Sequence, residues 1–429
     1  MVKYLIFFIT IVLLLGCNSS NDNTPAETTV DTSVKCSTTK QTNVTSTIDR
    51  PMLVVLLNYK NIQTTSSIET WAQKIFSKNE GSLNDYYQEV SKNQFEFSEA
   101  TECNGLASVY LDKNHPNTSI DSNSFDSAVH PDLALALASL DDNISFDIYD
   151  TDGDGHIQAD ELLITFIIAG YEDAYEGNHV TNGVWAHQYC TNSTYTPLLD
   201  GVSVMSCINN GNFALFGEKH NAANPHDATI GIIAHELGHS AFSLPDLYLG
   251  GGIGNFGLMG SGMWGYANNT ENEGQTPVHM TAWSKFYNDW ITLDNNTTGP
   301  KTMNATSSSS YNVVKVPNGE KYLLLENRDN SGYDKGLYML DGTFIGGLAI
   351  WEIDDTKTTQ THIDLNSVNS DPLNQGVYMV DAQGGFISDG VGGNENALFY
   401  NENVASYSTT NANITNIGTS GLTMTLDIN

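Results

Sequence analysis

The sequence has few positively charged residues. Its 429 residues include 17 Lys and Arg against 50 Asp and Glu, which gives a formal net charge of -33. This excess of negative charge repels nucleic acids and anionic membrane surfaces, so neither is an expected partner, and it suits an exported, soluble protein in a calcium-rich setting. The hydrophobic fraction of 40% is nevertheless that of a folded chain, and the length allows two domains with sizeable cores.

Cysteine is also scarce. Apart from Cys17, the chain contains only Cys36, Cys103, Cys190 and Cys207. No two of these four have the CxxC spacing of a cysteine zinc site. An even number in an exported protein instead predicts two disulfides. A bond between Cys190 and Cys207 would close a short loop and leave Cys36 to pair with Cys103.

No apolar run is long enough for a comfortable membrane span. The longest near the start, Tyr4–Leu15, follows one Lys and is typical of a signal peptide over residues 1–17. Its end, Leu14–Cys17, resembles the lipobox of bacterial lipoproteins, which would make Cys17 the lipidated first residue of the mature chain. The alternative is an ordinary secretory signal with an incidental cysteine. We therefore expect an exported bacterial lipoprotein, anchored at the cell surface or periplasmic face or released from it.

Residues 18–47 are rich in Ser, Thr, Asn and Asp and have almost no large apolar side chains. This composition predicts a flexible tether between the lipid anchor and the first folded domain.

The motif with the clearest chemistry is His235–His239, with the sequence HELGH. Residues four apart lie on one face of a helix, so His235 and His239 can bind one metal ion. Glu236 can then reach a water on that metal and act as general base, as in zinc hydrolases. The surrounding residues predict a buried helix, in which two imidazoles and a carboxylate are costly unless a metal satisfies them. The apolar positions are Ile230, Ile232, Ile233, Ala234, Leu237 and Ala241.

A catalytic zinc site needs a third protein ligand. Position 245 is Pro, which excludes a His six residues after His239, and Asp246 is the only acidic residue between His239 and Glu271. Asp246 is therefore the leading candidate, although an Asp after a Pro is also common in ordinary turns.

Met259 lies in a glycine-rich stretch, Asn255–Gly265. Glycines around a Met predict a tight turn beneath the metal, similar to the Met-turn of metzincins, and the alternative is a glycine-rich loop with a core Met. Tyr248 and Tyr266 are candidates, by residue type only, for stabilising the oxyanion.

Residues 150–161 match the twelve-residue EF-hand calcium loop. The expected ligands are Asp150, Asp152 and Asp154 at positions 1, 3 and 5, the carbonyl of His156 at position 7 and both carboxylate oxygens of Glu161 at position 12. The apolar run Leu162–Ala169 that follows predicts a core strand, and we see no second loop, so a structural calcium site is expected and not a sensor.

The chain resembles the M6 metallopeptidases, the immune inhibitor A group of secreted bacterial proteases, from about residue 50 to about residue 385. The resemblance implies His235, His239 and Asp246 as zinc ligands and Glu236 as the base. The family usually places the Asp six residues after the second His with a Gly between, whereas here it is the seventh, so one residue must bulge. The matching tracts are Gly81–Tyr87, Glu89–Ser91, His235–His239, Leu244–Tyr248, Leu258–Gly260, Pro277–Lys285, Leu325–Arg328 and Ile350–Asp354.

The order of patterns predicts an α/β (α+β) metzincin-like catalytic domain over residues 48–294 and a mostly β, sandwich-like module over residues 295–429. Residues 295–310 are expected to be a linker. Expected strands are Met52–Leu57, Gln94–Phe97 at a sheet edge, Asn312–Val316, Tyr322–Glu326, Leu348–Ile353, Gly376–Val380 and Leu422–Ile428. Expected helices are Ile68–Phe76, Ser82–Val90, Pro131–Leu140 and Trp283–Trp290.

The expected function is that of a monomeric, zinc-dependent endopeptidase that hydrolyses extracellular proteins or peptides and carries zinc for catalysis and calcium for structure. One alternative is a lipid-anchored surface binding or adhesion protein on an inactive protease scaffold. Another is a calcium-stabilised surface module in which the zinc motif is accidental.

Overall fold

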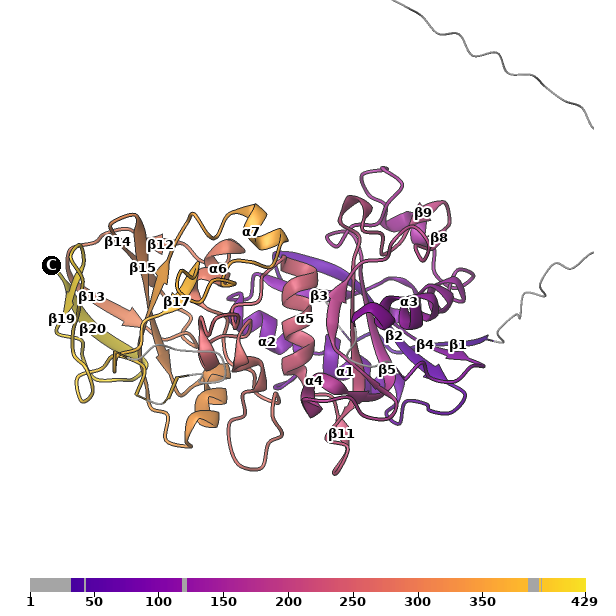
Figure 1. Cartoon of the computed structure of the whole chain (residues 1–429), viewed down its shortest axis with the longest axis horizontal. Coiled ribbons are helices and arrows are strands. Elements are labelled where there is room, and N and C mark those ends of the chain that lie inside the picture. The colour runs from indigo at the N-terminus through magenta and orange to yellow at the C-terminus, as the bar shows by residue number, and fades with distance from the viewer. Residues whose placement is uncertain (1–31, 42–43, 118–121, 385–392, 395) are drawn as a thin grey trace, which may run out of the picture.

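The computed structural model describes residues 32–41, 44–117, 122–384, 393–394 and 396–429 (Figure 1). The predicted signal peptide and the lipidation site at Cys17 lie outside the described residues. Within the described part, no helix is both long and apolar enough to cross a membrane.

The first half of the chain is built on a sheet that has nine strands among the described residues. Its order is β1-β4-β2-β5-β10-β11, with β3 paired to β2, β6 to β5 and β7 to β10. The strands are β1 (Thr32–Cys36), β2 (Ile48–Tyr59), β3 (Phe95–Glu99), β4 (Leu106–Leu111), β5 (Leu163–Glu172), β6 (Gly183–Val184), β7 (His187–Tyr189), β10 (Phe213–His220) and β11 (His226–Asp227). The four central strands, β4, β2, β5 and β10, are parallel, and β7 lies antiparallel to β10.

Helices cover both faces of this sheet (Figure 1). Successive side chains of a strand point to opposite faces, so Met52, Val54 and Leu56 of β2 join one core and Leu53 and Val55 join the other. The first core contains α1 (Ile68–Phe76), α2 (Leu83–Val90) and α5 (Ile230–Phe242), and the second contains α3 (Ser122–Ala138). The predicted strands at 52–57 and 162–169 are confirmed as central strands buried on both faces, which is usual for parallel sheets.

Two predictions for this half need correction. The tether was expected to be flexible to residue 47, but Thr32–Cys36 forms β1, because it pairs with all but the first residue of β4 and is bonded through Cys36 to Cys103. The helix expected from Pro131 begins at Ser122 and continues through the proline, although an interior proline removes one hydrogen bond and its ring crowds the carbonyl four residues earlier. Strand β3 is confirmed at the sheet edge, since among the described residues it pairs with β2 alone, and it is wholly buried because α2 and Phe242 cover it.

Both predicted disulfides, Cys36–Cys103 and Cys190–Cys207, are confirmed. Disulfides persist in oxidising compartments, so the folded part of the chain is extracytoplasmic.

The C-terminal region is a sandwich of two sheets, as predicted. One has the order β12-β14-β15-β16-β17 and the other β13-β20-β19-β18. Residues 295–310 are not simply a linker, because β13 pairs along six residues with the last strand, β20. The strands are β12 (Leu293–Asp294), β13 (Gly299–Asn304), β14 (Val313–Asn318), β15 (Lys321–Asp329), β16 (Gly346–Ile353), β17 (Val377–Met379), β18 (Tyr407–Ser408), β19 (Asn413–Thr415) and β20 (Thr423–Ile428).

The sandwich shares its core with the catalytic half. Leu323 and Leu325 of β15 face the second sheet, whereas Tyr322 and Leu324 point into the core that also holds α1, α2 and α5. The five-stranded sheet is therefore covered on both sides. The remaining helices are α4 (Asp173–Glu176), α6 (Ala282–Tyr287) and α7 (Gln360–Asp364).

Candidate functional site

Helix α5 presents the HELGH motif from inside the core. Every residue of the helix except His239 is buried, and His239 is partly buried. The helix ends at Ser243, which takes the left-handed conformation (φ 53°) and donates its N–H to the carbonyl of His239 at 2.9 Å. The chain turns back at this point, which brings Asp246 over the helix.

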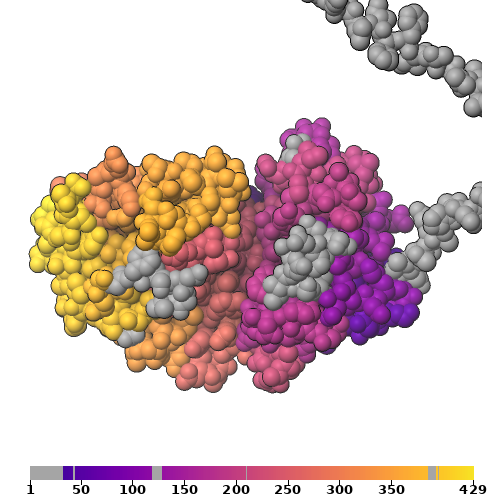
Figure 2. Space-filling view, in the orientation of Figure 1, coloured from indigo at the N-terminus to yellow at the C-terminus, as the bar shows by residue number. Residues whose placement is uncertain are grey.

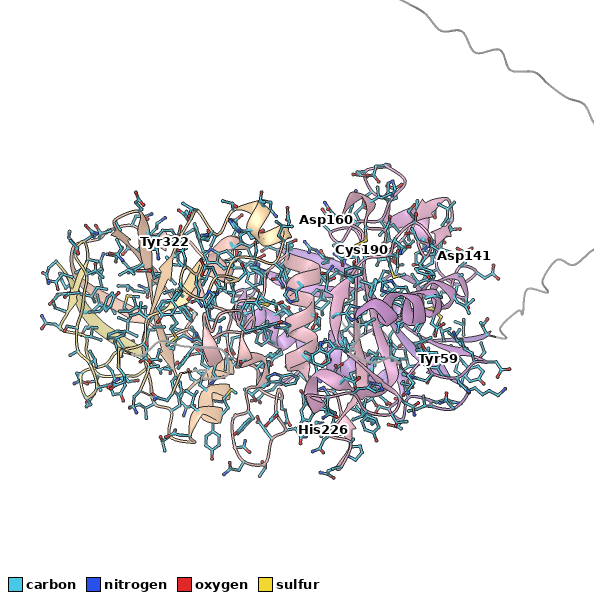
Figure 3. All side chains as sticks on the ribbon, in the orientation of Figure 1. Tyr59, Asp141, Asp160, Cys190, His226 and Tyr322 are labelled. Carbon is cyan, nitrogen blue, oxygen red and sulfur yellow. A yellow bond between two sulfur atoms is a disulfide. The ribbon has the colours of Figure 1, made fainter. Side chains whose placement is uncertain are left out.

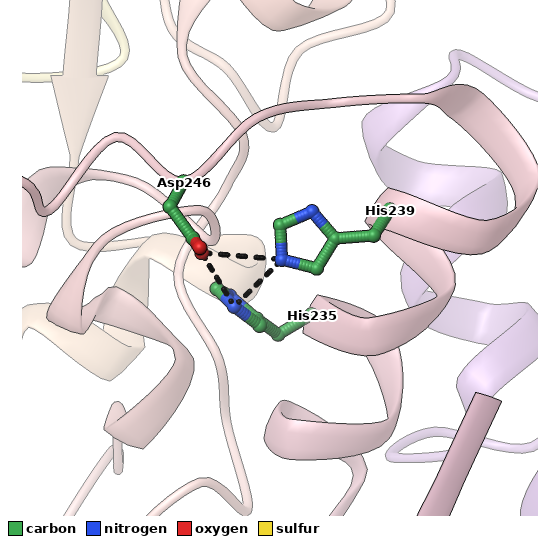
Figure 4. Close-up of side chains that lie close together, drawn as sticks. All are labelled: His235, His239 and Asp246. Atoms are coloured by element: carbon green, nitrogen blue, oxygen red, sulfur yellow. Dashed lines mark hydrogen bonds and ion pairs between the residues drawn. The ribbon is translucent and has the colours of Figure 1, made fainter. Parts of the chain in front are cut away.

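His235, His239 and Asp246 converge on one point (Figure 4). The two Nε2 atoms lie 3.2 Å apart, and the Oδ1 atom of Asp246 lies 3.2 Å from Nε2 of His235 and 3.1 Å from that of His239. Ligands at the usual zinc distances in tetrahedral geometry are separated by about 3.3 Å. Among the described residues, Oδ1 accepts no hydrogen bond from any other group although it is buried. The donor set and its spacing therefore fit zinc, and the additional residue before Asp246 does not prevent this.

Backbone carbonyls orient both imidazoles. Nδ1 of His235 lies 3.0 Å from the carbonyl of Leu258, and Nδ1 of His239 lies 2.5 Å from that of Leu244. Each Nδ1 therefore carries the proton that it donates, and in the neutral ring, which is the form that binds a metal, each Nε2 presents a lone pair to the shared point.

The Asp246 carboxylate and the imidazoles of His235 and His239 interact electrostatically, which shifts the pKa of Asp246 and of His239. Burial raises the pKa of Asp246, but the imidazoles of His235 and His239 outweigh burial and lower it well below its usual value. Burial lowers the pKa of His239, but the Asp246 carboxylate outweighs it and raises this pKa to about 9. The aspartate is thus held in its ionised form.

Glu236 is held beside the metal site by strand β7. It is buried, with 6% of its surface exposed, and the backbone N–H of Gln188 in β7 is near enough to favour its charged form. Burial raises the pKa of Glu236, and the neighbouring imidazoles oppose this rise. A carboxylate with a raised pKa next to a metal position is suited to accept a proton from water.

The comparison with known protein families agrees with this geometry. Residues 61–291 match the family described as immune inhibitor A peptidase M6, catalytic domain, a stretch that covers more than half of the chain. The chain belongs to the M6 peptidase family. No curated protein matches it. Membership confirms the predicted resemblance and makes the chain a zinc metalloendopeptidase.

The active-site cleft of this M6 peptidase has a volume of about 1330 Å³ and lies between the two halves of the chain. Figure 2 shows a furrow between the orange and red surface and the magenta surface. One wall includes Asp160 and Cys190, both labelled near the upper end of α5 in Figure 3. The opposite wall includes Ile363 and Asn366, from α7 and the turn after it. The sandwich region therefore forms part of the cleft.

A buried glutamate supports the strand that contacts Glu236. Glu172, at the end of β5, accepts N–H groups from Ala174 (3.0 Å), Ala186 (2.8 Å) and Gly217 (2.8 Å). Burial raises its pKa to about 8, and the three N–H donors oppose the rise. These bonds hold the start of β7 against β10.

Two of the other predicted site residues are near the metal site and one is not. Met259 is buried against Gly238 of the motif and follows Leu258, the partner of His235, as expected of a Met-turn. Tyr248 lines the cleft and stacks on His235 at a ring separation of 6.2 Å. Tyr266 packs on Tyr338 and does not line the cleft.

The predicted calcium loop brings together Asp150, Asp152 and Asp154, whose carboxylate oxygens lie within 4.8 Å of one another. The Glu161 carboxylate is outside this group and accepts N–H groups from Thr151 and Gln158 of its own loop. The loop continues directly into β5, as predicted.

His156, the remaining loop position, forms a β-bridge with Ser203. The loop is thereby tied to the segment closed by Cys190–Cys207, and Asp152 itself lines the cleft.

The sequence pattern did not reveal Gln188, Arg50 and Asn366 as site residues. Gln188 lines the cleft, where its backbone favours the charged form of Glu236, and Arg50 lines the cleft and donates to the Ala241 carbonyl at the end of α5. Asn366 bonds to Asp246 from 120 positions away. None of these interactions leaves a local motif.

Proposed function

We propose that this M6 peptidase hydrolyses extracellular proteins or peptides, with His235, His239 and Asp246 as zinc ligands and Glu236 as general base. The observation that carries the proposal is the triangle of two Nε2 atoms and one Oδ1 atom, each about 3.2 Å from the next, beside a buried glutamate.

Zinc held there supplies a Lewis acid that makes water more acidic and polarises a peptide carbonyl. Glu236 takes the proton of the attacking water and passes it to the leaving amine. The backbone N–H of Gln188 favours the charged form of Glu236, which is the form that accepts the proton. Tyr248 is the cleft residue that we assign to the carbonyl oxygen as its charge develops, because its ring stacks on His235.

The cleft is suited to an extended chain. His187 and Gln188 of β7 line it, and among the described residues β7 pairs with β10 alone. A substrate strand added beside β7 would continue past the metal site in both directions, as an endopeptidase requires.

Calcium is the second metal that we infer. Three carboxylates of residues 150–154 share one small volume and would repel one another without a cation. We assign the carbonyl of His156 and the carboxylate of Glu161 to the same ion. Because the loop borders the cleft, calcium would stabilise one wall of it.

The setting that we propose is an exported, monomeric lipoprotein attached to a membrane through Cys17. The disulfides support the exported part of this proposal.

The test is zinc content and casein cleavage of residues 18–429, measured beside Glu236→Ala. We expect about one zinc per chain in both proteins and cleavage only by the unmodified chain. The matched control is Glu320→Ala, which removes an exposed glutamate of the C-terminal region. This variant should cleave casein as the unmodified chain does. Zinc without cleavage in either form would favour a surface binding or adhesion protein, and absence of zinc would favour a calcium-stabilised structural module.

A further inference from the structure

The zinc-binding aspartate is held by a residue of the C-terminal region. Asn366 donates its Nδ2–H to Oδ2 of Asp246 at 2.6 Å, and its Oδ1 accepts the backbone N–H of Asp246 at 2.7 Å. The amide of one side chain thus bonds to both the carboxylate and the main chain of the same residue.

The backbone of Asn366 is itself fixed. It lies in the turn after α7, where its N–H donates to the carbonyl of Ile363 at 2.9 Å, and Ile363 is buried in the main core. The φ angle of Asn366 is 48°, in the left-handed region that Asn and Gly adopt more easily than other residues. The turn therefore presents the amide at a defined position.

The two oxygens of Asp246 have different partners as a result. Oδ2 is occupied by Asn366, whereas Oδ1 faces the imidazoles of His235 and His239. A carboxylate whose outer oxygen is engaged in this way offers one oxygen to a metal. That leaves a coordination position for water, which a catalytic zinc site requires.

We propose that Asn366 is a positioning residue that makes Asp246 a single-oxygen zinc ligand, so that the metal centre is completed by the C-terminal region. This inference rests on the proposed function, because it takes Asp246 as a ligand.

Asn369, three residues after Asn366, already makes contacts that join the two regions of the chain. Asn369 is buried and donates to the carbonyls of Leu247 (3.1 Å) and Val377 (2.8 Å), which ties the loop after Asp246 to β17. Asn366 is exposed at the cleft, and among the described residues both polar ends of its side chain bond to Asp246 alone. Its contacts therefore serve the ligand and not the joint between the two regions.

Two variants separate the contributions. Asn366→Gly removes the amide and keeps the left-handed backbone accessible. Asn366→Asp keeps the shape and the acceptor for the Asp246 N–H, but places an oxygen against Oδ2. We expect zinc affinity, measured by competition with a chelator in the full soluble chain, to fall about 10–100-fold in both, and further in Asn366→Asp. With Co²⁺ in place of zinc, the visible spectrum of Asn366→Gly should shift toward that of a five-coordinate ion, because Asp246 can then bind through both oxygens.

Asn369→Ala is the control. It weakens the same joint without touching Asp246, so it should lower thermal stability more than Asn366→Gly and leave zinc affinity within a few-fold. Unchanged zinc affinity and an unchanged Co²⁺ spectrum in both Asn366 variants would overturn the inference while leaving the proposed function intact. Failure of the unmodified chain to bind zinc would overturn the proposed function itself. If Asn366→Gly does not fold, the isosteric Asn366→Asp still gives both measurements.

Discussion

The guanidinium of Arg328 and the carboxylate of Asp334 form a two-pronged ion pair with no exposure to solvent. Nε of Arg328 donates to Oδ2 at 2.6 Å and Nη2 donates to Oδ1. The third nitrogen, Nη1, donates to the carbonyl of Phe256 at 2.7 Å, close to the Met259 turn. Asp334 also accepts the backbone N–H of His279. This buried pair thus helps to join the sandwich to the loops under the metal site.

Replacing Arg328 with Met should strongly destabilise the folded protein. It leaves Asp334 buried without its partner, which costs about 3–5 kcal/mol of unfolding free energy. The double variant Arg328→Met/Asp334→Leu removes both charges and should lose less than the single variant. Urea denaturation of the three proteins measures this. A double variant that is less stable than the single one would contradict the explanation.

The chain cut after residue 294 lacks both Arg328 and Asp334, and therefore should not fold into an active protease.

Two glycines of α5 should respond differently to alanine. A Cβ on Gly231 would lie 1.9 Å from the carbonyl oxygen of Met263, which is backbone and cannot move alone, whereas a Cβ on Gly238 would meet the Sδ of Met259 at 2.6 Å. Alanine favours a helix over glycine by about 1 kcal/mol, but overpacking costs about 1–3 kcal/mol. We expect Gly231→Ala to lower the melting temperature clearly and Gly238→Ala to lower it less. Equal effects in thermal denaturation would contradict the contact with Met263.

His115 should make the protein less stable in mild acid. It is buried, and its Nδ1 accepts the N–H of Asn117 at 2.9 Å, which requires the neutral ring. Burial, with a smaller effect of His179, lowers the pKa of His115 from 6.5 to about 4. The unfolded chain therefore binds the proton first, so this contribution is complete above pH 6.5 and is lost as the pH falls through 4. The loss is at most about 3 kcal/mol.

The variant His115→Gln keeps an acceptor for Asn117 and does not titrate. As the pH falls from 7 to 4.5, the unfolding free energy of this variant should therefore rise relative to that of the unmodified chain. Urea denaturation at constant calcium measures this difference. A difference that does not change with pH would show that His115 is not the titrating group.

Removal of calcium should lower stability through residues 150–161. Without a cation, the carboxylates of Asp150, Asp152 and Asp154 repel one another within 4.8 Å. A ligand present at 100–1000 times its dissociation constant adds about 3–4 kcal/mol to the unfolding free energy, so a chelator selective for calcium should lower the melting temperature by several degrees. Asp150→Asn should abolish most of this response. Asp147→Asn, which changes an exposed aspartate just before the loop, should retain it.

Much of the site could be predicted from the sequence because its determinants are local. The spacing of His235 and His239 places them on one face of a helix whatever the rest of the fold, and the twelve-residue loop contains the three carboxylates that the structure brings together. The buried strand at 52–57 is equally a matter of short-range pattern. The helix Ile68–Phe76 was predicted with its observed bounds, since Ser67 caps it and its apolar spacing is regular.

The tertiary structure decided what depends on distant segments. Strands β1 and β13 lie in polar stretches without a strand pattern and exist because β4 and β20 pair with them. The backbone of Gln188 reaches Glu236 from strand β7, and the orientation of Asp246 depends on Asn366 in the opposite wall of the cleft. The sequence by itself determined which residues can bind the metal. Which oxygen of Asp246 faces it was decided by packing, because hydrogen bonds between segments more than a hundred residues apart form only when the shared core brings them together.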